Sequence, residues 1–283
     1  MNTFSQTFRF SRWWLLVSKH WSENSKRYLL FLLAIAGLLL AWFSFILMIS
    51  RPALVDTFIQ FSTYYIGLFL VGCLYASTLF SELSSKREGI RYLALPASHF
   101  EKFLCAIFYG VVLFFTAYTL VFYLVDIPMV QLSNNILEKY PRNFYNSSLR
   151  VEPSDVYNIF TAAQGPMPEK DFHLFLCTFF SAQAVFILGS LYYTRYAFIK
   201  SIIAVLACAL LYVIIQARLI GSLLPRGWSG DFFNWVHTDA DGHPDKLIYL
   251  PNLLGRMLTL LIQVAPPFVV YTITYLRLKE KEV

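Results

Sequence analysis

The chain has 283 residues, of which 57% are hydrophobic, 18% are aromatic and only 14% are charged. A water-soluble globule of this length would have to expose large apolar patches at that composition, so a soluble fold is excluded. The formal net charge of +6 does not indicate a nucleic-acid-binding protein, because the basic residues are scattered between apolar segments and form no basic stripe. We therefore expect one helical membrane domain that covers residues 1–283.

Six long apolar segments predict six membrane-spanning helices, since each is long enough to cross a hydrocarbon core of about 30 Å. Hydrocarbon offers the backbone no hydrogen-bond partner, so helices are the expected structure and the expected fold class is all-α. Spans 1–3 are expected within residues 28–126 and spans 4–6 within residues 172–283. The segments begin near Tyr28, Thr57, Phe100, Phe172, Phe198 and Pro251.

The segment before the first span, residues 1–27, predicts an amphipathic helix that lies in the cytoplasmic membrane interface. Its aromatic face would enter the headgroup layer, where Trp rings are favoured, and its cations would stay in water. A plain cytoplasmic extension of the first span is the alternative. The residues that share the apolar face at 3.6 residues per turn are Phe10, Trp13, Trp14, Val17 and Trp21.

The basic residues predict the topology. Most of the 23 Lys and Arg residues fall in segments on the same side as the N-terminus, and the others are spread mainly over two longer loops, where charge has less influence. We expect a multi-pass protein of the inner (plasma) membrane with both termini in the cytoplasm. Residues 127–171 and 219–250 are then external loops. The four cysteines fall inside the spans and predict no disulfide framework.

No set of residues predicts catalysis, a metal site or a cofactor. Gly227–Gly230 matches the G-x-S-G string of rhomboid-type intramembrane proteases, but it lies in an external loop without a membrane-embedded histidine base. Asp239, Asp241 and Asp245 do not have the spacing of an EF-hand calcium loop. No P-loop string is present, so a partner would have to bind ATP if ATP drives the protein. The chain is expected not to be an enzyme.

The charged residues also argue against an ion-coupled carrier, because those near the apolar segments all lie at segment ends. The sixth segment contains Pro266-Pro267, which removes two backbone donors and should bend the helix there. This bend is either a structural or a gating element.

The segment between the second and third spans carries the most informative pattern. A polar run from Glu82 to Arg91 is followed by Leu93–Ser98 and then by Glu101-Lys102-Phe103. This pattern resembles the first cytoplasmic loop of ABC-2 type transporter permeases, the transmembrane subunits of ATP-binding cassette exporters. The wider layout is also similar to that family, with an N-terminal interfacial helix, six spans and a large external region before the last span. That region lacks an obvious pair of re-entrant half-helices, so the resemblance does not indicate the substrate.

The resemblance implies a permease subunit that forms the substrate pathway and docks separate ABC ATPase subunits through the cytoplasmic coupling loop, residues 81–99. It also implies a dimer with a second permease chain, identical or related, in the lipid bilayer. The expected docking residues are Glu82, Lys86, Arg87, Glu88, Ile90, Arg91, Tyr92 and Leu93. The candidate pathway residues are Tyr64, Tyr65, Ser77, Thr78 and Gln216, and Gly67 and Gly72 would permit close helix packing.

The alternative function is a non-enzymatic membrane scaffold or assembly protein. Its external loop between Asp126 and Asp171 would then bind other envelope proteins through exposed tyrosines and phenylalanines.

Overall fold

The protein is helical and of the membrane type. Five helices are long and apolar enough to cross a membrane by length and composition. The computed structural model describes residues 8–49, 55–84, 89–90, 94–139, 153–159, 169–215, 228–230, 234–238, 244–249 and 252–280. The helices are α1 (Phe10–Ile49), α2 (Thr57–Ala76), α4 (His99–Ile107), α5 (Phe114–Lys139), α6 (Glu169–Tyr192), α7 (Ala197–Ile215) and α9 (Asn252–Glu280).

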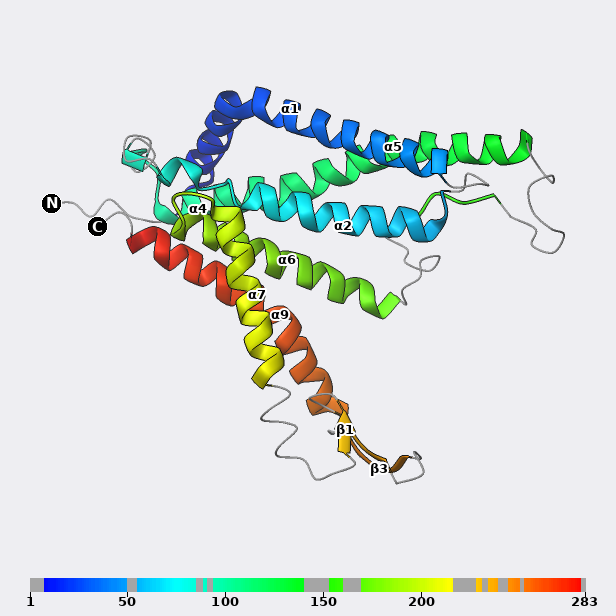
Figure 1. Ribbon diagram of the computed structural model, residues 1–283. Helices are drawn as coiled ribbons and strands as arrows, with labels where there is room; N and C mark the ends of the chain where they lie inside the picture. The colour runs from blue at the N-terminus through cyan, green and yellow to red at the C-terminus, as the bar shows by residue number, and fades with distance from the viewer. Residues whose placement is uncertain are drawn as a thin grey trace.

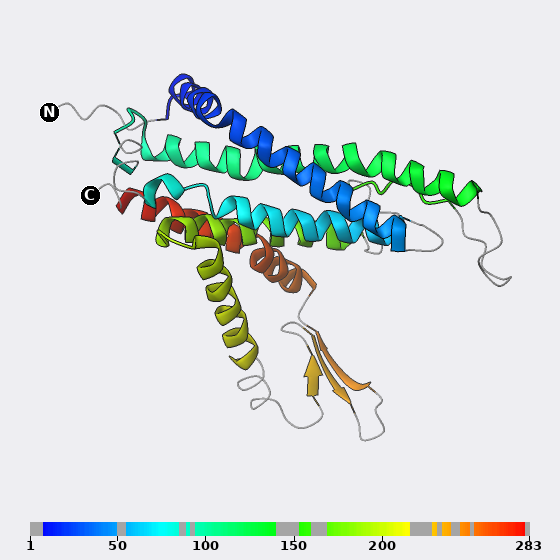
Figure 2. The ribbon, with the colours of Figure 1, turned by 45° about the horizontal axis from the view of Figure 1, so that its top comes forward.

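Helix α1 joins the expected interfacial helix and the first span in one element of 40 residues. Figures 1 and 2 show that its first part, in dark blue, turns steeply away from the rest, so the helix bends sharply without ending. The predicted apolar face is divided between two environments. Trp13 and Val17 are buried, whereas Phe10, Trp14 and Trp21 remain exposed. The first part of α1 therefore packs on the protein with one edge of its aromatic face and leaves the other edge free.

The third span is longer than expected. Helices α4 and α5 are joined by a π-helical turn, η2 (Phe108–Leu113), into one apolar stretch from His99 to Lys139. Residues 127–139, which the sequence assigned to the external loop, are helical in spite of Pro128. Helix α5 thus extends beyond the neighbouring ends of α1 and α2 (Figure 1).

The sixth predicted span corresponds to α9, which is not among the five helices that qualify as candidate spans within the described residues, so a sixth crossing stays a prediction. Pro266 and Pro267 lie inside α9, and Figure 1 shows that its orange and red parts run in different directions, as expected for a proline bend. Helix α7 leaves the bundle at a steep angle in both ribbon views, together with the first part of α9.

A small antiparallel sheet lies in the second predicted external loop. Its strands are β1 (Trp228–Gly230), β2 (Asn234–Thr238) and β3 (Pro244–Tyr249), in the order β1-β2-β3. In Figure 2 the sheet stands apart from the bundle. The sequence predicted an external loop here and no strands were identified in it, because three short strands give too weak a periodic pattern to be recognised.

The bundle core is aromatic, and it fixes α1, α2 and α5 to one another. The Tyr64 ring lies 5.0 Å from the Phe122 ring and 5.6 Å from the Tyr118 ring, measured between centroids. The Tyr118 hydroxyl donates to the Tyr64 carbonyl at 3.1 Å, and the Tyr64 and Thr119 hydroxyls are 3.0 Å apart. Buried hydroxyls in this core therefore have partners, as an apolar surrounding requires.

Candidate partner-docking site

A tight turn at the end of α2 leads into the coupling loop, and its side chains bond to its own backbone. The Ser77 hydroxyl donates to the Leu74 carbonyl at 2.7 Å, and the Thr78 hydroxyl donates to the Tyr75 carbonyl at 2.8 Å. A short 3-10 helix, η1 (Ser81–Ser84), follows. The side chains thus satisfy carbonyls that the end of a helix leaves without an intrahelical partner.

The loop ends in a capping box at the start of α4. The Glu101 amide donates to the Ser98 hydroxyl at 3.2 Å, and the Ser98 amide donates back to the Glu101 carboxylate at 2.9 Å. This reciprocal pair fixes the direction in which the chain enters the helix.

The same carboxylate also anchors the start of α1. Glu101 is fully buried and accepts two hydrogen bonds from the Arg12 guanidinium, at 2.7 Å from Nε and 2.8 Å from Nη2. The Arg9 amide donates to it at 2.9 Å. A two-pronged guanidinium–carboxylate pair restricts orientation as well as distance. One side chain therefore joins the end of the coupling loop, the start of the third span and the N-terminal part of α1.

Aromatic packing extends this junction along α4 and η2. Trp13 and Val17 of α1 form a buried cluster with Cys105 and Tyr109. The Tyr109 hydroxyl donates to the Val17 carbonyl at 2.8 Å. The Trp13 ring meets the Phe108 ring edge-on at 5.6 Å between centroids. The N-terminal part of α1 is thus held on the third span by a hydrogen bond and by ring contacts.

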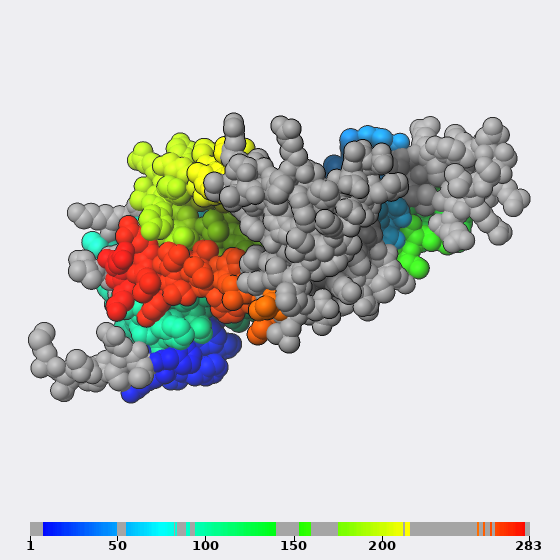
Figure 3. All heavy atoms as spheres, turned by 90° about the horizontal axis from the view of Figure 1, so that it is seen from below, coloured from blue at the N-terminus to red at the C-terminus, as the bar shows by residue number. Residues whose placement is uncertain are grey.

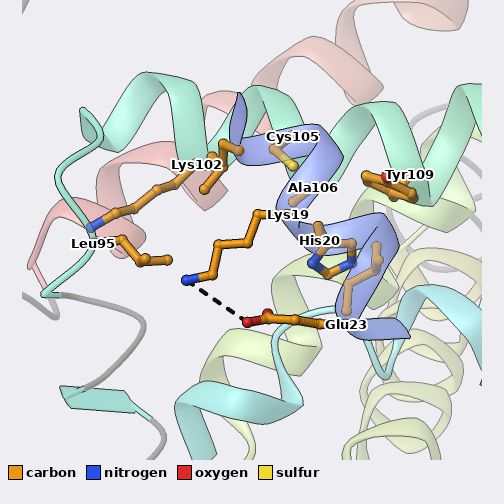
Figure 4. Close-up of a pocket in the computed structure, with 10 residues that line it drawn as sticks. Lys19, His20, Glu23, Leu95, Lys102, Cys105, Ala106 and Tyr109 are labelled. Atoms are coloured by element: carbon orange, nitrogen blue, oxygen red, sulfur yellow. Dashed lines mark ion pairs between the residues drawn. The ribbon is translucent and has the colours of Figure 1, made fainter. Parts of the chain in front are cut away.

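A small pocket lies inside the junction, between α1, α4 and the end of the coupling loop (Figure 4). Figure 4 shows the side chains of Lys19 and Lys102 both extending toward Leu95 of the loop. The Lys19 ammonium is 3.8 Å from the Glu23 carboxylate. The end of the loop therefore contributes an apolar side chain to the same pocket as two cationic side chains, one from α1 and one from α4.

The C-terminal end of α9 completes the junction. The Tyr275 ring lies 5.7 Å from the Phe103 ring and 6.2 Å from the Phe100 ring. Figure 3 shows the red end of α9 against the teal surface of α4, with the blue start of α1 beyond it. Three helices that are distant in sequence thus meet where the coupling loop enters the third span.

The predicted docking residues are only partly described. Glu82 lies in η1, and Ile90 is 61% exposed, which suits an apolar anchor on a surface. The remaining docking residues lie outside the described residues, and these are Lys86, Arg87, Glu88, Arg91, Tyr92 and Leu93.

The predicted pathway residues do not form one lining. Tyr64 is buried in the aromatic core, and the hydroxyls of Ser77 and Thr78 are bonded to backbone carbonyls. Tyr65 lines an apolar groove on another face of α2, and Gln216 lies outside the described residues. Gly67 and Gly72 serve close packing, because a Cβ atom on them would meet Tyr118 and Phe179 respectively.

An extended segment toward the other end of the bundle from the coupling loop, residues 153–159, is held by side chains that the sequence analysis did not identify (Figure 1). Gln60 donates to the Asp155 carbonyl at 3.0 Å and accepts from the Tyr157 amide at 2.7 Å. Asn134 forms two hydrogen bonds with the Ser154 backbone. Burial raises the pKa of Tyr157, so its hydroxyl keeps its proton. We call residues 153–159 the strap.

The sequence analysis did not predict the pair formed by Arg12 and Glu101, although the capping box that includes Glu101 could be recognised from the sequence. Ser98 and Glu101 have the S-x-x-E spacing of a capping box before an apolar run. The ion pair with Arg12 joins residues that are 89 positions apart, so no local sequence pattern predicts it. Gln60 and the strap were missed for the same reason.

Within the described residues no group of three or more His, Cys, Asp or Glu side chains is arranged to hold a metal ion. The four cysteines are free thiols. No protein-family model, curated protein or solved structure matches the chain. The function therefore has to be argued from the residues alone.

Proposed function

We propose that the chain is the membrane-spanning permease subunit of an ABC-type exporter. A separate ATPase subunit docks on the coupling loop, residues 81–99, and the chain itself carries out no bond chemistry. A second permease chain, identical or related, completes the transporter. The resemblance of the coupling loop to that of ABC-2 permeases gives this proposal its family, with the coupling loop on the cytoplasmic face of the inner membrane.

The observation that carries the proposal is the Glu101 junction. A loop that transmits force needs a stiff attachment to the helices that it moves, and this one has a capping box and a two-pronged ion pair at its exit. A loop that only connects two helices does not need a stiff attachment to a residue 89 positions away, whereas a loop that moves helices does.

The mechanical role follows from the helices that meet at the junction. When two ATPase subunits close, a docked loop is displaced as a rigid body. Because Glu101 ties the loop to both α1 and α4, a displacement of the loop moves the start of the first and third spans together. Tyr275 of α9 packs on Phe103, so the last helix follows the same movement.

The test is purification of the native complex, followed by a search for a bound P-loop ATPase. We expect the ATPase to co-purify with the unchanged protein and to be lost when Arg87→Glu and Tyr92→Ala are introduced together. Arg87→Glu replaces a cation at the charged edge of the predicted docking surface by an anion, and Tyr92→Ala removes an aromatic ring from its apolar part.

The control makes the same two changes in the predicted external loop, as Arg142→Glu with Tyr145→Ala. This variant should keep the ATPase. Absence of any nucleotide-binding partner from the native complex would refute the proposal, as would equal behaviour of the two double variants.

The strap favours a second candidate function, a scaffold that binds envelope partners on its external side. Side-chain hydrogen bonds hold residues 153–159 against α2 and α5, so this surface is presented in a defined shape. In that case partners would be lost from the Arg142→Glu, Tyr145→Ala variant and kept by the coupling-loop variant.

A further inference from the structure

An apolar groove runs between α2, α6 and α7. Its walls are mainly aromatic, with Tyr65 and Phe69 from α2, Phe175 from α6 and Phe198 from α7. Its volume of about 640 Å³ is within the range of sites that bind small molecules. Figures 1 and 2 show that α7 diverges from the bundle after its connecting turn with α6, and Phe186 of α6 packs against Phe198 of α7 at 5.6 Å between ring centroids.

The groove lies on helices that qualify as candidate membrane spans, and on α2 it occupies the half that leads to the coupling loop. On α2 it runs from Tyr65, near the middle of the helix, to Cys73, close to its end at Ala76. The eight steps from residue 65 to residue 73 rise by about 12 Å, which is close to the ~15 Å depth of one hydrocarbon leaflet. Phe198 and Ile202 belong to the first turns of α7, which begin at the same end of the bundle.

The chemistry of the lining restricts what can occupy the groove. Among the described residues no charged side chain lines it, and the hydroxyl of the one tyrosine in this lining, Tyr65, is engaged by Tyr157 of the strap. A polar or charged ligand would therefore lose its hydration without gaining a hydrogen bond. A flexible alkyl chain in the bilayer carries no hydration to lose, and in the groove it exchanges contacts with mobile lipid tails for contacts with fixed rings.

We propose that this groove binds one acyl chain of an amphipathic molecule that enters from the membrane leaflet on the coupling-loop side. The inference rests on the proposed function and deepens it, because it assigns the transported substrate to amphiphiles that carry at least one long alkyl chain. The polar end of such a molecule lies toward the turn between α6 and α7, where Arg195 and Lys200 are exposed.

The test uses the purified full-length protein in nanodiscs with phosphatidylethanolamine that carries a diazirine in the middle of one acyl chain. After illumination, the labelled residues are mapped by mass spectrometry. We expect the label on the groove residues Phe69, Cys73 and Ile202 and much less on Leu206 and Leu210, which are exposed on α7.

Two matched pairs of variants test whether the groove itself holds the chain. Ile202→Trp fills the groove, whereas Ile203→Trp places the same ring on the exposed side of α7. Leu70→Trp and Leu74→Trp form an equivalent pair on α2, of which only Leu70 lines the groove. Labelling of the groove should be lost in the first member of each pair and kept in the second.

Uniform labelling of all exposed apolar residues would mean that only annular lipid is present and would overturn the inference. Oxidative cross-linking of Cys73 between two copies of the chain would also overturn it, because a second copy would then fill the groove. Co-purification of the ATPase is measured on the same variants. Groove labelling that is absent from the unchanged protein, or that persists in the groove-filling variants, would reject the acyl-chain site, and a retained ATPase would then leave the proposed permease intact.

Discussion

Glu101 shows how one buried carboxylate can order several elements. Its two oxygens accept from the Arg9 amide, the Arg12 guanidinium and the Ser98 amide. A buried charge is tolerated only when partners of this kind surround it, so the side chain and its donors depend on one another. Glu101 therefore holds several elements together, whereas the sequence alone shows only a charged residue at the start of the third span.

Exchange of Glu101 for Gln should weaken the junction without changing its shape. The amide keeps the size of the side chain but turns one acceptor into a donor that faces Arg12 or a backbone amide. We expect the free energy of unfolding to fall by roughly 2 kcal/mol, as for a hydrogen bond to a charged group.

Thermal unfolding of the detergent-solubilised protein measures this loss. The same exchange at Glu138, which is exposed near the end of α5, is the control and should leave the melting temperature unchanged. Equal melting temperatures for Glu101→Gln and the unchanged protein would show that the junction adds nothing to stability.

Gln60 holds the strap to α2, and its replacement by Leu should release residues 153–159. The variant leaves the Tyr157 amide and the Asp155 carbonyl without their partner, at about 1–3 kcal/mol for a buried unsatisfied group. Hydrogen exchange of the strap amides should become faster while exchange in α2 changes little. Gln131→Leu, at an exposed position of α5, is the matched control. Unchanged protection of the strap would contradict its anchoring by Gln60.

At the scale of elements, the third span is the unusual one. The π-helical turn η2 interrupts an otherwise α-helical stretch, and such turns are frequent at functional sites. The Gly110 carbonyl in this turn accepts from the Gln183 amide of α6 at 3.1 Å. Gly110 also packs against Leu79, which lies in the turn between α2 and the coupling loop. The turn therefore links the loop to the bundle core at a second place.

A methyl group at position 110 should disturb that link. In Gly110→Ala the new Cβ atom would overlap the end of the Leu79 side chain, and the expected cost is about 1–2 kcal/mol, as for overpacking elsewhere. Gly37→Ala is the control, because nothing lies within 4 Å of a Cβ atom there and alanine favours a helix. The two melting temperatures should move in opposite directions. A stabilised Gly110→Ala variant would show that Leu79 moves aside freely.

The sequence predicted the elements better than it predicted their contacts. Long apolar runs led directly to the helical membrane class, and Pro266-Pro267 led to the bend in α9. The end of the third span was placed too early, because the charge of Asp126 and the proline that follows suggested a boundary that the helix passes through. The junction at Glu101 and the groove at Tyr65 depend on residues distant in sequence, which no local periodicity reveals.

At the scale of the whole molecule, the coupling loop, the start of α1 and the end of α9 lie at one end of the bundle, and the strap lies toward the other (Figure 1). This separation gives the protein two distinct surfaces at opposite ends of the bundle. One is tied rigidly to three helices, and the other is presented on an extended segment. Which of them faces the cytoplasm decides whether an ATPase can reach the coupling loop.

The charge distribution predicts that the coupling loop faces the cytoplasm, and cysteine labelling tests this directly. All four native thiols lie in helices of the membrane type, so their exchange for Ala gives a background without reactive cysteines. A single Cys is then placed in the coupling loop as Ser85→Cys or in the predicted external loop as Asn146→Cys. In intact cells a membrane-impermeant maleimide should label only the Cys at position 146. The Cys at position 85 should react only after permeabilisation, because Lys and Arg are retained on the cytoplasmic side. The reverse pattern would place the Glu101 junction outside the cell, where no ATP-hydrolysing subunit can bind it.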